Sequence, residues 1–255
     1  MVLRSILEFR LIGPFKTTIL MSVVFFFAGL ATDVVAQKRF SRTYPAGSNV
    51  RLDLINRSGL VEVQGWDRRE INVTATMEAP TANIVPQSTN GGVDINVLRD
   101  NHGRDIGSVN FLVRVPFNTV VAIETRIGNL SVSNVRSGFV RAYISSEGDI
   151  TLTNISASSV SAENRLGDIF FDGELHLNGD YRFSSTSGRI NVRIPFASSF
   201  KLVATAPSTR NITLGPFSNG ENVWGDGRRV MGKFGTGSAS VTATNKLGSI
   251  AFFGR

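Results

Sequence analysis

Apolar and polar residues alternate along most of this chain from about residue 40 onwards. Short runs with an apolar residue at every second position, such as residues 93–97, 109–115 and 200–204, are separated by glycine, asparagine, serine and proline. Alternation with a period of two places successive side chains on opposite faces of a β-strand. No stretch of ten to twelve residues carries apolar positions at helical spacing, so the pattern predicts an all-β protein.

A short phrase recurs within this pattern. It consists of a small polar residue, two further residues, a glycine, and apolar residues at the second and fourth positions after the glycine. The glycines of the copies are Gly59, Gly128, Gly148, Gly167, Gly188 and Gly248, with a weaker copy at Gly107. From Gly107 to Gly188 successive glycines are 21, 20, 19 and 21 residues apart. A fixed period near 20 residues indicates a stack of repeats that bury their apolar side chains against one another.

The apolar residues after the glycines are expected to form two inward-facing columns. The second positions are Val61, Val109, Leu130, Ile150, Ile169, Ile190 and Ile250, and the fourth positions are Val63, Phe111, Val132, Leu152, Phe171, Val192 and Phe252. A β-sandwich does not require the same phrase at every second strand, and the leucine-rich repeat motif is missing. We therefore predict a single-stranded, right-handed parallel β-helix (β-solenoid) with coils of about 20 residues.

Two stretches interrupt the repeat. Residues 76–106 are rich in proline, glycine and polar residues and are expected to form exposed turns, and residues 215–237 are expected to form a long irregular loop. Arg210 replaces a repeat glycine 38 residues before Gly248, which corresponds to two coils. The chain ends at Arg255 directly after a repeat strand, whose bare edge would need a cover. The loop at 215–237 or a partner chain is expected to cover it, and self-association through the C-terminal coil would be one such cover.

The first 36 residues have the organisation of a signal peptide. Three cations lie within the first 16 residues, and the uncharged, mostly apolar run 18–31 follows. This run is shorter than the ~20 residues of a membrane-spanning helix, and Val34-Val-Ala36 offers small residues for a signal peptidase. We predict cleavage after Ala36, with an uncleaved membrane anchor as the alternative, and a β-solenoid domain over residues 37–255. The protein is then exported to the periplasm, the outer envelope or the extracellular space.

The amino-acid composition limits the kinds of catalytic and binding site that the chain can form. The chain has no cysteine, which excludes disulfides, thiolate metal sites and a cysteine nucleophile. Its net charge is +7, and it remains +6 when the first 36 residues are removed. A modest basic excess favours anionic surfaces, but for most proteins it is only a contribution to solubility.

A sparse basic stripe is the clearest candidate for ligand binding. Two residues before the glycines lie Arg57, Arg126, Arg165 and Lys246. On a solenoid these side chains would line one edge and could hold acidic polysaccharide, lipid headgroups or nucleic acid. The absence of interleaved aromatic residues argues against nucleic acid. A solvated face that discourages aggregation of strands is the competing interpretation.

Other polar residues do not assemble into a catalytic set. Asp149 and Asp168 occupy equivalent slots, where stacked acids could hold calcium or act as an acid and a base. An Asp168–Arg189 surface pair explains the same column without a site. His102 and His176 lack neighbouring metal ligands, and no Gly-x-Ser-x-Gly elbow occurs. We therefore assign no catalytic, metal-binding or cofactor-binding residue and predict that the protein is not an enzyme.

Several phrases point to a known family. They lie at residues 56–67, 115–117, 181–195 and 235–250. Together they resemble the bacterial exported β-strand-repeat family labelled putative adhesin, which is related to the head domains of auto-transporter-like adhesins. The resemblance covers roughly residues 40–255. It implies a parallel β-helix at a bacterial cell envelope and offers no catalytic residues.

The leading functional hypothesis is a non-enzymatic envelope protein whose faces bind or scaffold. Its expected partners are surface glycans, anionic envelope polymers or other proteins, but not nucleic acid, and it would contact a membrane only through an uncleaved N-terminal segment. The alternatives are a polysaccharide-acting β-helix enzyme and a structural protein that assembles end to end.

Overall fold

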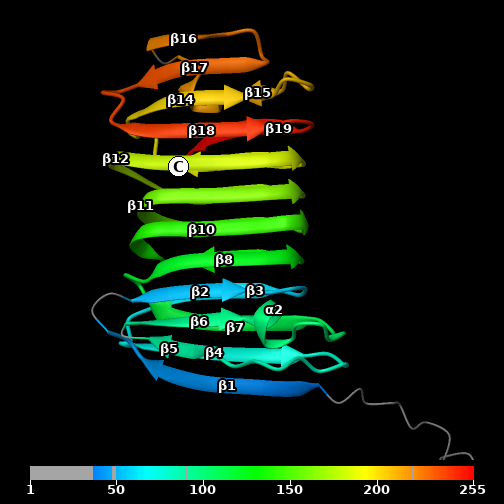
Figure 1. Cartoon of the computed structure of the whole chain (residues 1–255). Helices are drawn as coiled ribbons and strands as arrows, with labels where there is room; N and C mark the ends of the chain where they lie inside the picture. Colours follow the sequence, from blue (N-terminus) through cyan, green and yellow to red (C-terminus); the bar gives the residue numbers. More distant parts are fainter. Residues whose placement is uncertain (1–36, 48–49, 90, 220) are drawn as a thin grey trace, which may run out of the picture. The chain divides into compact units, whose positions relative to one another are not determined.

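The computed structural model describes residues 37–255 except 48, 49, 90 and 220 (Figure 1). The predicted signal peptide and its cleavage site after Ala36 lie outside the described residues. Within the described part, no helix is long and apolar enough to cross a membrane.

Strands form nearly all of the regular structure, which confirms the all-β prediction. They are β1 (Lys38–Pro45), β2 (Arg51–Ile55), β3 (Val61–Trp66), β4 (Glu70–Met77), β5 (Gln87–Thr89), β6 (Gly92–Asn96), β7 (Val109–Pro116), β8 (Val120–Ile127), β9 (Leu130–Ser133), β10 (Arg136–Glu147), β11 (Ile150–Leu166), β12 (Ile169–Ser187), β13 (Arg189–Ile194), β14 (Phe200–Thr205), β15 (Ile212–Thr213), β16 (Glu221–Gly225), β17 (Arg229–Phe234), β18 (Ala239–Asn245) and β19 (Ser249–Gly254). The described helices are the single turns α2 (Val97–Asp100) and η1 (Gly215–Phe217).

Consecutive repeats pair in parallel through the middle of the chain. Val140 of β10 lies opposite Val121 of β8 on one side and Val160 of β11 on the other, and β11 continues the register into β12. Figure 1 shows β8, β10, β11 and β12 lying one above the next. We call each repeat, with its strands before and after the corner glycine, a rung. Neighbouring rungs are separated by the ordinary strand spacing of about 4.8 Å.

The buried apolar side chains form one core cluster that runs through the stack of rungs. Every residue of the two predicted apolar columns is buried, and the polar residues between them lie on the outside. Phe171 packs against Tyr181 and Phe183, and Phe200 packs against Phe234, so aromatic rings fill the C-terminal part of the core. Burial of each such side chain contributes roughly 1.5–3 kcal/mol to stability.

The order of the rungs departs from the order of the chain at both ends. The Gly59 rung (β2, β3) pairs with β6 and β7 on one side and with β8 and β9 on the other. The Gly248 rung (β18, β19) is inserted between β12 and β13 on one side and β14 and β15 on the other. The sequence predicted that Arg210 and Gly248 are two coils apart. Their rungs are direct neighbours, so this prediction was wrong. Long connections allow the chain to leave a gap that a later rung with matching columns fills.

Antiparallel pairs complete both ends of the stack. β4 runs antiparallel to β1 and β7, β5 to β6, and β17 to β14 and β16. The prediction of exposed turns at 76–106 was thus wrong for β5, β6 and α2, and the prediction of an irregular loop at 215–237 was wrong for β16 and β17. Alternating residues in β6 bury Val93 and Ile95, which is the local reason for a strand there.

The corner glycines satisfy a steric requirement. Gly128, Gly148, Gly167 and Gly188 have φ angles of 115°, 141°, 128° and 125°. A Cβ atom at each would lie 2.1–2.2 Å from the carbonyl oxygen of the corner glycine one rung away. Side chains are therefore excluded by both the conformation and the neighbouring backbone. Arg210 adopts φ 54° and Ile212 aligns with Ile250, so it does occupy a glycine slot.

One copy of the repeat was placed in the wrong register. Phe111, rather than Val109, lies opposite Val61, so Val109 occupies the glycine slot predicted for Gly107. The Asn110 side chain accepts a hydrogen bond from the Leu60 N–H at 2.8 Å, which fixes this register.

The predicted cover for the last repeat strand is confirmed in part. β19 pairs with β13 and β15 and contacts η1, which belongs to the 215–237 segment. The outermost strand beyond β14 is β16, so the C-terminal coil lies inside the stack.

Candidate binding surface

The predicted basic stripe follows the glycine corner of the stack. Arg57 and Arg126 lie on adjacent rungs, since the Ile127 N–H donates to the Arg57 carbonyl oxygen at 3.2 Å. Arg165 follows two rungs after Arg126, and Lys246 two rungs after Arg165. Insertion of the Gly248 rung next to the Gly188 rung therefore brings Lys246 closer to Arg165 than chain order predicts.

The four cations differ in their ion pairing. Arg57 Nη1 lies 3.6 Å from Asp105 Oδ1, an exposed pair of small energetic value. Arg126, Arg165 and Lys246 are exposed and have no carboxylate of a described residue within 4.0 Å. Three of the four predicted residues are thus available to an external anion.

An exposed aliphatic residue follows each of these three cations. Ile127, Leu166 and Leu247 are 45%, 44% and 60% exposed. Sequence reasoning missed them, although the dipeptides Arg-Ile, Arg-Leu and Lys-Leu immediately before the glycines were the available signal. We call Arg126, Ile127, Arg165, Leu166, Lys246 and Leu247 the cation–aliphatic corner.

The rungs between these dipeptides carry polar residues. Glu147 aligns with Ile127 on one side and Leu166 on the other, and Ser187 aligns with Leu166. The corner therefore alternates between rungs with a cation and an aliphatic residue and rungs with small polar or acidic residues. Glu147 places the opposite charge between the first two cations.

The neighbouring acidic column has a structural role. Asp149 Oδ1 accepts the Asp168 N–H at 2.7 Å, and Asp168 Oδ1 accepts the Arg189 N–H at 2.8 Å. The Arg189 guanidinium also donates to Asp168 Oδ2 at 2.6 Å and 2.9 Å, which raises the pKa of Arg189 above its ordinary value. These carboxylates join rungs, in agreement with the surface-pair interpretation. No group of three His, Asp or Glu side chains with metal-binding geometry occurs among the described residues.

The structure also reveals a serine–histidine contact that the sequence did not indicate. Ser156 Oγ lies 2.8 Å from His176 Nε2, and the His176 N–H donates to the Tyr181 hydroxyl at 2.7 Å. Tyr181 in turn donates to the Ala157 carbonyl oxygen. These bonds hold the 174–181 segment of β12 against β11. His102 is exposed in the turn after α2.

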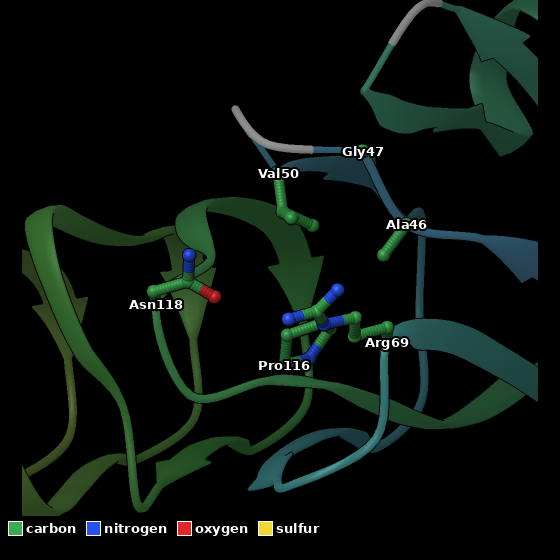
Figure 2. Close-up of a pocket in the computed structure, with 6 residues that line it drawn as sticks. All are labelled: Ala46, Gly47, Val50, Arg69, Pro116 and Asn118. Carbon is green, nitrogen blue, oxygen red and sulfur yellow. The ribbon is translucent and has the colours of Figure 1, made fainter.

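The described residues form concave regions near the ends of the stack, of which two are considered for binding. One cavity of about 440 Å³ is lined by Ala46, Gly47, Val50, Arg69, Pro116 and Asn118. Figure 2 shows the side chains of Val50, Asn118 and Arg69 directed toward the same space. The other, of about 460 Å³, borders Trp224, whose side chain is 62% exposed. Trp66 instead donates its indole N–H to the Glu70 carbonyl oxygen at 2.9 Å.

The fold and the surface together define a β-repeat protein whose exposed cations and aliphatic residues lie along the glycine corner of the stack. The family described as Toastrack DUF4097 matches residues 45–251, and the chain belongs to this family. This agrees with the resemblance found in the sequence.

Several solved structures are similar to this chain. A putative cell adhesion protein from Clostridium sporogenes is 12% identical with a TM-score of 0.49, and the match covers 86% of this chain and 100% of that chain. A putative adhesin from Bacteroides fragilis is 8% identical with a TM-score of 0.38, over 86% of this chain and 98% of that chain. A putative lipid binding protein from Parabacteroides distasonis is 10% identical with a TM-score of 0.33, over 84% and 96%. Comparison with curated protein sequences finds no match.

Proposed function

We propose that this chain is a non-enzymatic, exported protein of the bacterial cell envelope that acts as an adhesin-like binding surface. The cation–aliphatic corner is the observation that carries the proposal. Its three cations face solvent with no carboxylate of a described residue in reach, and its three aliphatic side chains are about half exposed. Exposed apolar residues gathered on one feature are typical of a contact surface.

The proposal also states that the fold is a right-handed parallel β-helix and that the protein is exported after cleavage of a signal peptide. The parallel register of consecutive rungs supports a right-handed β-helix through the middle of the chain, because parallel crossover connections are overwhelmingly right-handed. The basic, apolar and small-residue regions of residues 1–36 support export with cleavage after Ala36. The N-terminal sequence of the protein recovered from a secreting bacterium tests this, and a mature chain that begins at Gln37 is the expected result.

The binding proposal is tested with isolated bacterial envelopes. The full chain is compared with the variant R126A/R165A/K246A and with the control R104A/R114A/K201A, which removes the same charge from exposed positions elsewhere. The expected result is envelope binding that only the first variant loses. Equal binding by both variants, or no binding by the wild-type chain, would overturn the proposed function.

An end-to-end assembling protein is the second candidate. β16 is the outermost strand at its end of the stack. β17 pairs with one edge of β16, and no strand of the described residues pairs with the other edge. A free strand edge is a template for pairing with another chain. Light scattering over a range of concentrations distinguishes this candidate, because growth through β16 would raise the mass with concentration.

A further inference from the structure

We propose that the cation–aliphatic corner docks on an anionic lipid bilayer surface. The proposal rests on the function proposed above and names the partner of that surface. It extends the sequence prediction, in which only an uncleaved N-terminal segment would touch a membrane.

The spatial order of the rungs builds this surface. The Gly128, Gly148, Gly167, Gly188 and Gly248 rungs follow one another, so Arg126-Ile127, Arg165-Leu166 and Lys246-Leu247 occupy alternate rungs. With a rung spacing of about 4.8 Å, the first and the last dipeptide are about 19 Å apart along the stack. A planar partner can contact all three dipeptides at once.

The chemistry of the pairs favours a lipid surface over a soluble polyanion. Cations alone would suit acidic polysaccharide, but each cation here is next to an exposed aliphatic side chain with no hydrogen-bonding group. At a bilayer surface the cation meets anionic headgroups while the aliphatic side chain enters the boundary between headgroups and acyl chains. Both halves of each dipeptide then gain contacts, whereas a polysaccharide would leave Ile127, Leu166 and Leu247 in water.

Acidic residues in the same corner set the strength of the interaction. Asp105 offsets Arg57, and Asp168 offsets Arg189, as their ion pairs show. Glu147 remains between the cations on the intervening rung and opposes an anionic surface. Electrostatic attraction of the corner to an anionic bilayer is therefore weak, and docking also requires the aliphatic residues. Removal of the Glu147 charge is expected to strengthen docking.

Vesicles of phosphatidylcholine, with or without an equal part of phosphatidylglycerol, test the proposal in a sedimentation assay with the full chain. Neutral vesicles measure the binding that does not depend on anionic headgroups, including any contribution of residues 18–31, which all variants share. The variant R126A/R165A/K246A is expected to lose about 100-fold of the additional affinity for anionic vesicles, since each cation near an anionic leaflet contributes about fivefold. The control R104A/R114A/K201A is expected to retain most of that affinity.

A second pair of variants separates lipid from polysaccharide. I127S/L166S/L247S is expected to lose about tenfold for anionic vesicles, whereas the exposed control L98S/L177S/V85S is not. E147Q is expected to bind anionic vesicles several-fold more tightly. Binding to heparin that equals vesicle binding and is unaffected by I127S/L166S/L247S would overturn the lipid proposal in favour of a polyanion.

The two proposals fail in different ways. If envelopes bind the chain through the three cations but anionic vesicles do not, the lipid proposal is overturned and the proposed function stands. If neither envelopes nor vesicles distinguish R126A/R165A/K246A from its control, both are overturned.

Discussion

Arg193 Nη2 lies 2.5 Å from Asp172 Oδ2, and this ion pair joins two neighbouring rungs near the C-terminal end of the stack. The carboxylate side chain is 6% exposed, while the guanidinium is 45% exposed. Arg255 Nε lies 3.1 Å from Asp172 Oδ1, at an ion-pair distance but without the alignment of a hydrogen bond. One buried carboxylate therefore binds both β13 and the last residue of the chain.

Asp172→Asn is expected to destabilise the protein by about 1–3 kcal/mol, because it removes charged hydrogen bonding at a buried position. Urea unfolding followed by circular dichroism measures the effect. Asp180→Asn is the matched control, since Asp180 pairs with Arg182 at 2.9 Å but its side chain is 38% exposed. Exposed pairs contribute about 0–1 kcal/mol, so equal effects of the two substitutions would contradict the role assigned to Asp172.

The buried hydroxyl of Tyr181 is expected to make the folded protein less stable in alkaline solution. Burial raises the pKa of its hydroxyl above the ordinary value of 10.0, because the phenolate would lose its hydration. The folded state then keeps the proton that the unfolded state releases. This contribution is fully present below pH 10 and is lost as the pH rises through the higher pKa of the folded state.

Tyr181→Phe isolates this contribution. The variant is expected to be less stable at pH 7 by about 1–3 kcal/mol, because the Ala157 carbonyl oxygen and the His176 N–H lose a buried partner. Its stability should also decline less than that of the wild type above pH 10. Parallel decline of both proteins in urea titrations from pH 8 to 11 would show that Tyr181 does not titrate in this way.

The repeat was readable from the sequence because its columns have a strict local signature. Val61 and Ile250 stand two residues after their glycines, and both are buried as predicted. The order of the rungs was not readable, since any rung with the same columns can pair with any other. The insertions of β2 and β3 at one end and of β18 and β19 at the other are decided by long connections, which leave no local pattern.

The candidate surface was predicted in part for the same reason. Arg126, Arg165 and Lys246 share a position before the glycine, so their alignment followed from the repeat. Ile127, Leu166 and Leu247 were not singled out, because an isolated exposed aliphatic residue is common in proteins. Their role as part of a binding surface becomes apparent only when the rungs place all three beside cations on one corner.

The glycine corner predicts a sharp positional difference between two alanine substitutions. Gly148→Ala would force φ 141° on alanine and place Cβ 2.1 Å from the Gly128 carbonyl oxygen. Conformational strain alone costs about 1–3 kcal/mol, and the clash adds to it. Gly138→Ala meets no atom within 4 Å and is the control, expected within about 1 kcal/mol of the wild type. Melting temperatures of the two variants that differ by less than the experimental error would refute the steric requirement.

The inserted C-terminal rung makes the end of the chain central to folding of the segment before it. A chain that ends at Ser238 lacks β18 and β19, and thereby loses the strand β18 that pairs in parallel with β12 on one side and β14 on the other. In a repeat protein each rung is stabilised mainly by its neighbours, so this gap is expected to separate residues 200–234 from the stack. Hydrogen exchange should then lose protection in β14 and β17, while β8 and β10 remain protected, because their partners are untouched.

Conventional stacking in chain order predicts the opposite outcome. If the last repeat lay at the outer end, the same truncation would fray only its immediate neighbour and leave β14 protected. Phe252→Ala provides a milder test in the full-length chain, since its ring stacks with that of Phe200 at a centroid distance of 6.3 Å. This substitution is expected to cost about 3–5 kcal/mol and to reduce protection in β14 before it reduces protection in β10. Retained protection of β14 in both variants would contradict the inserted position of the final rung.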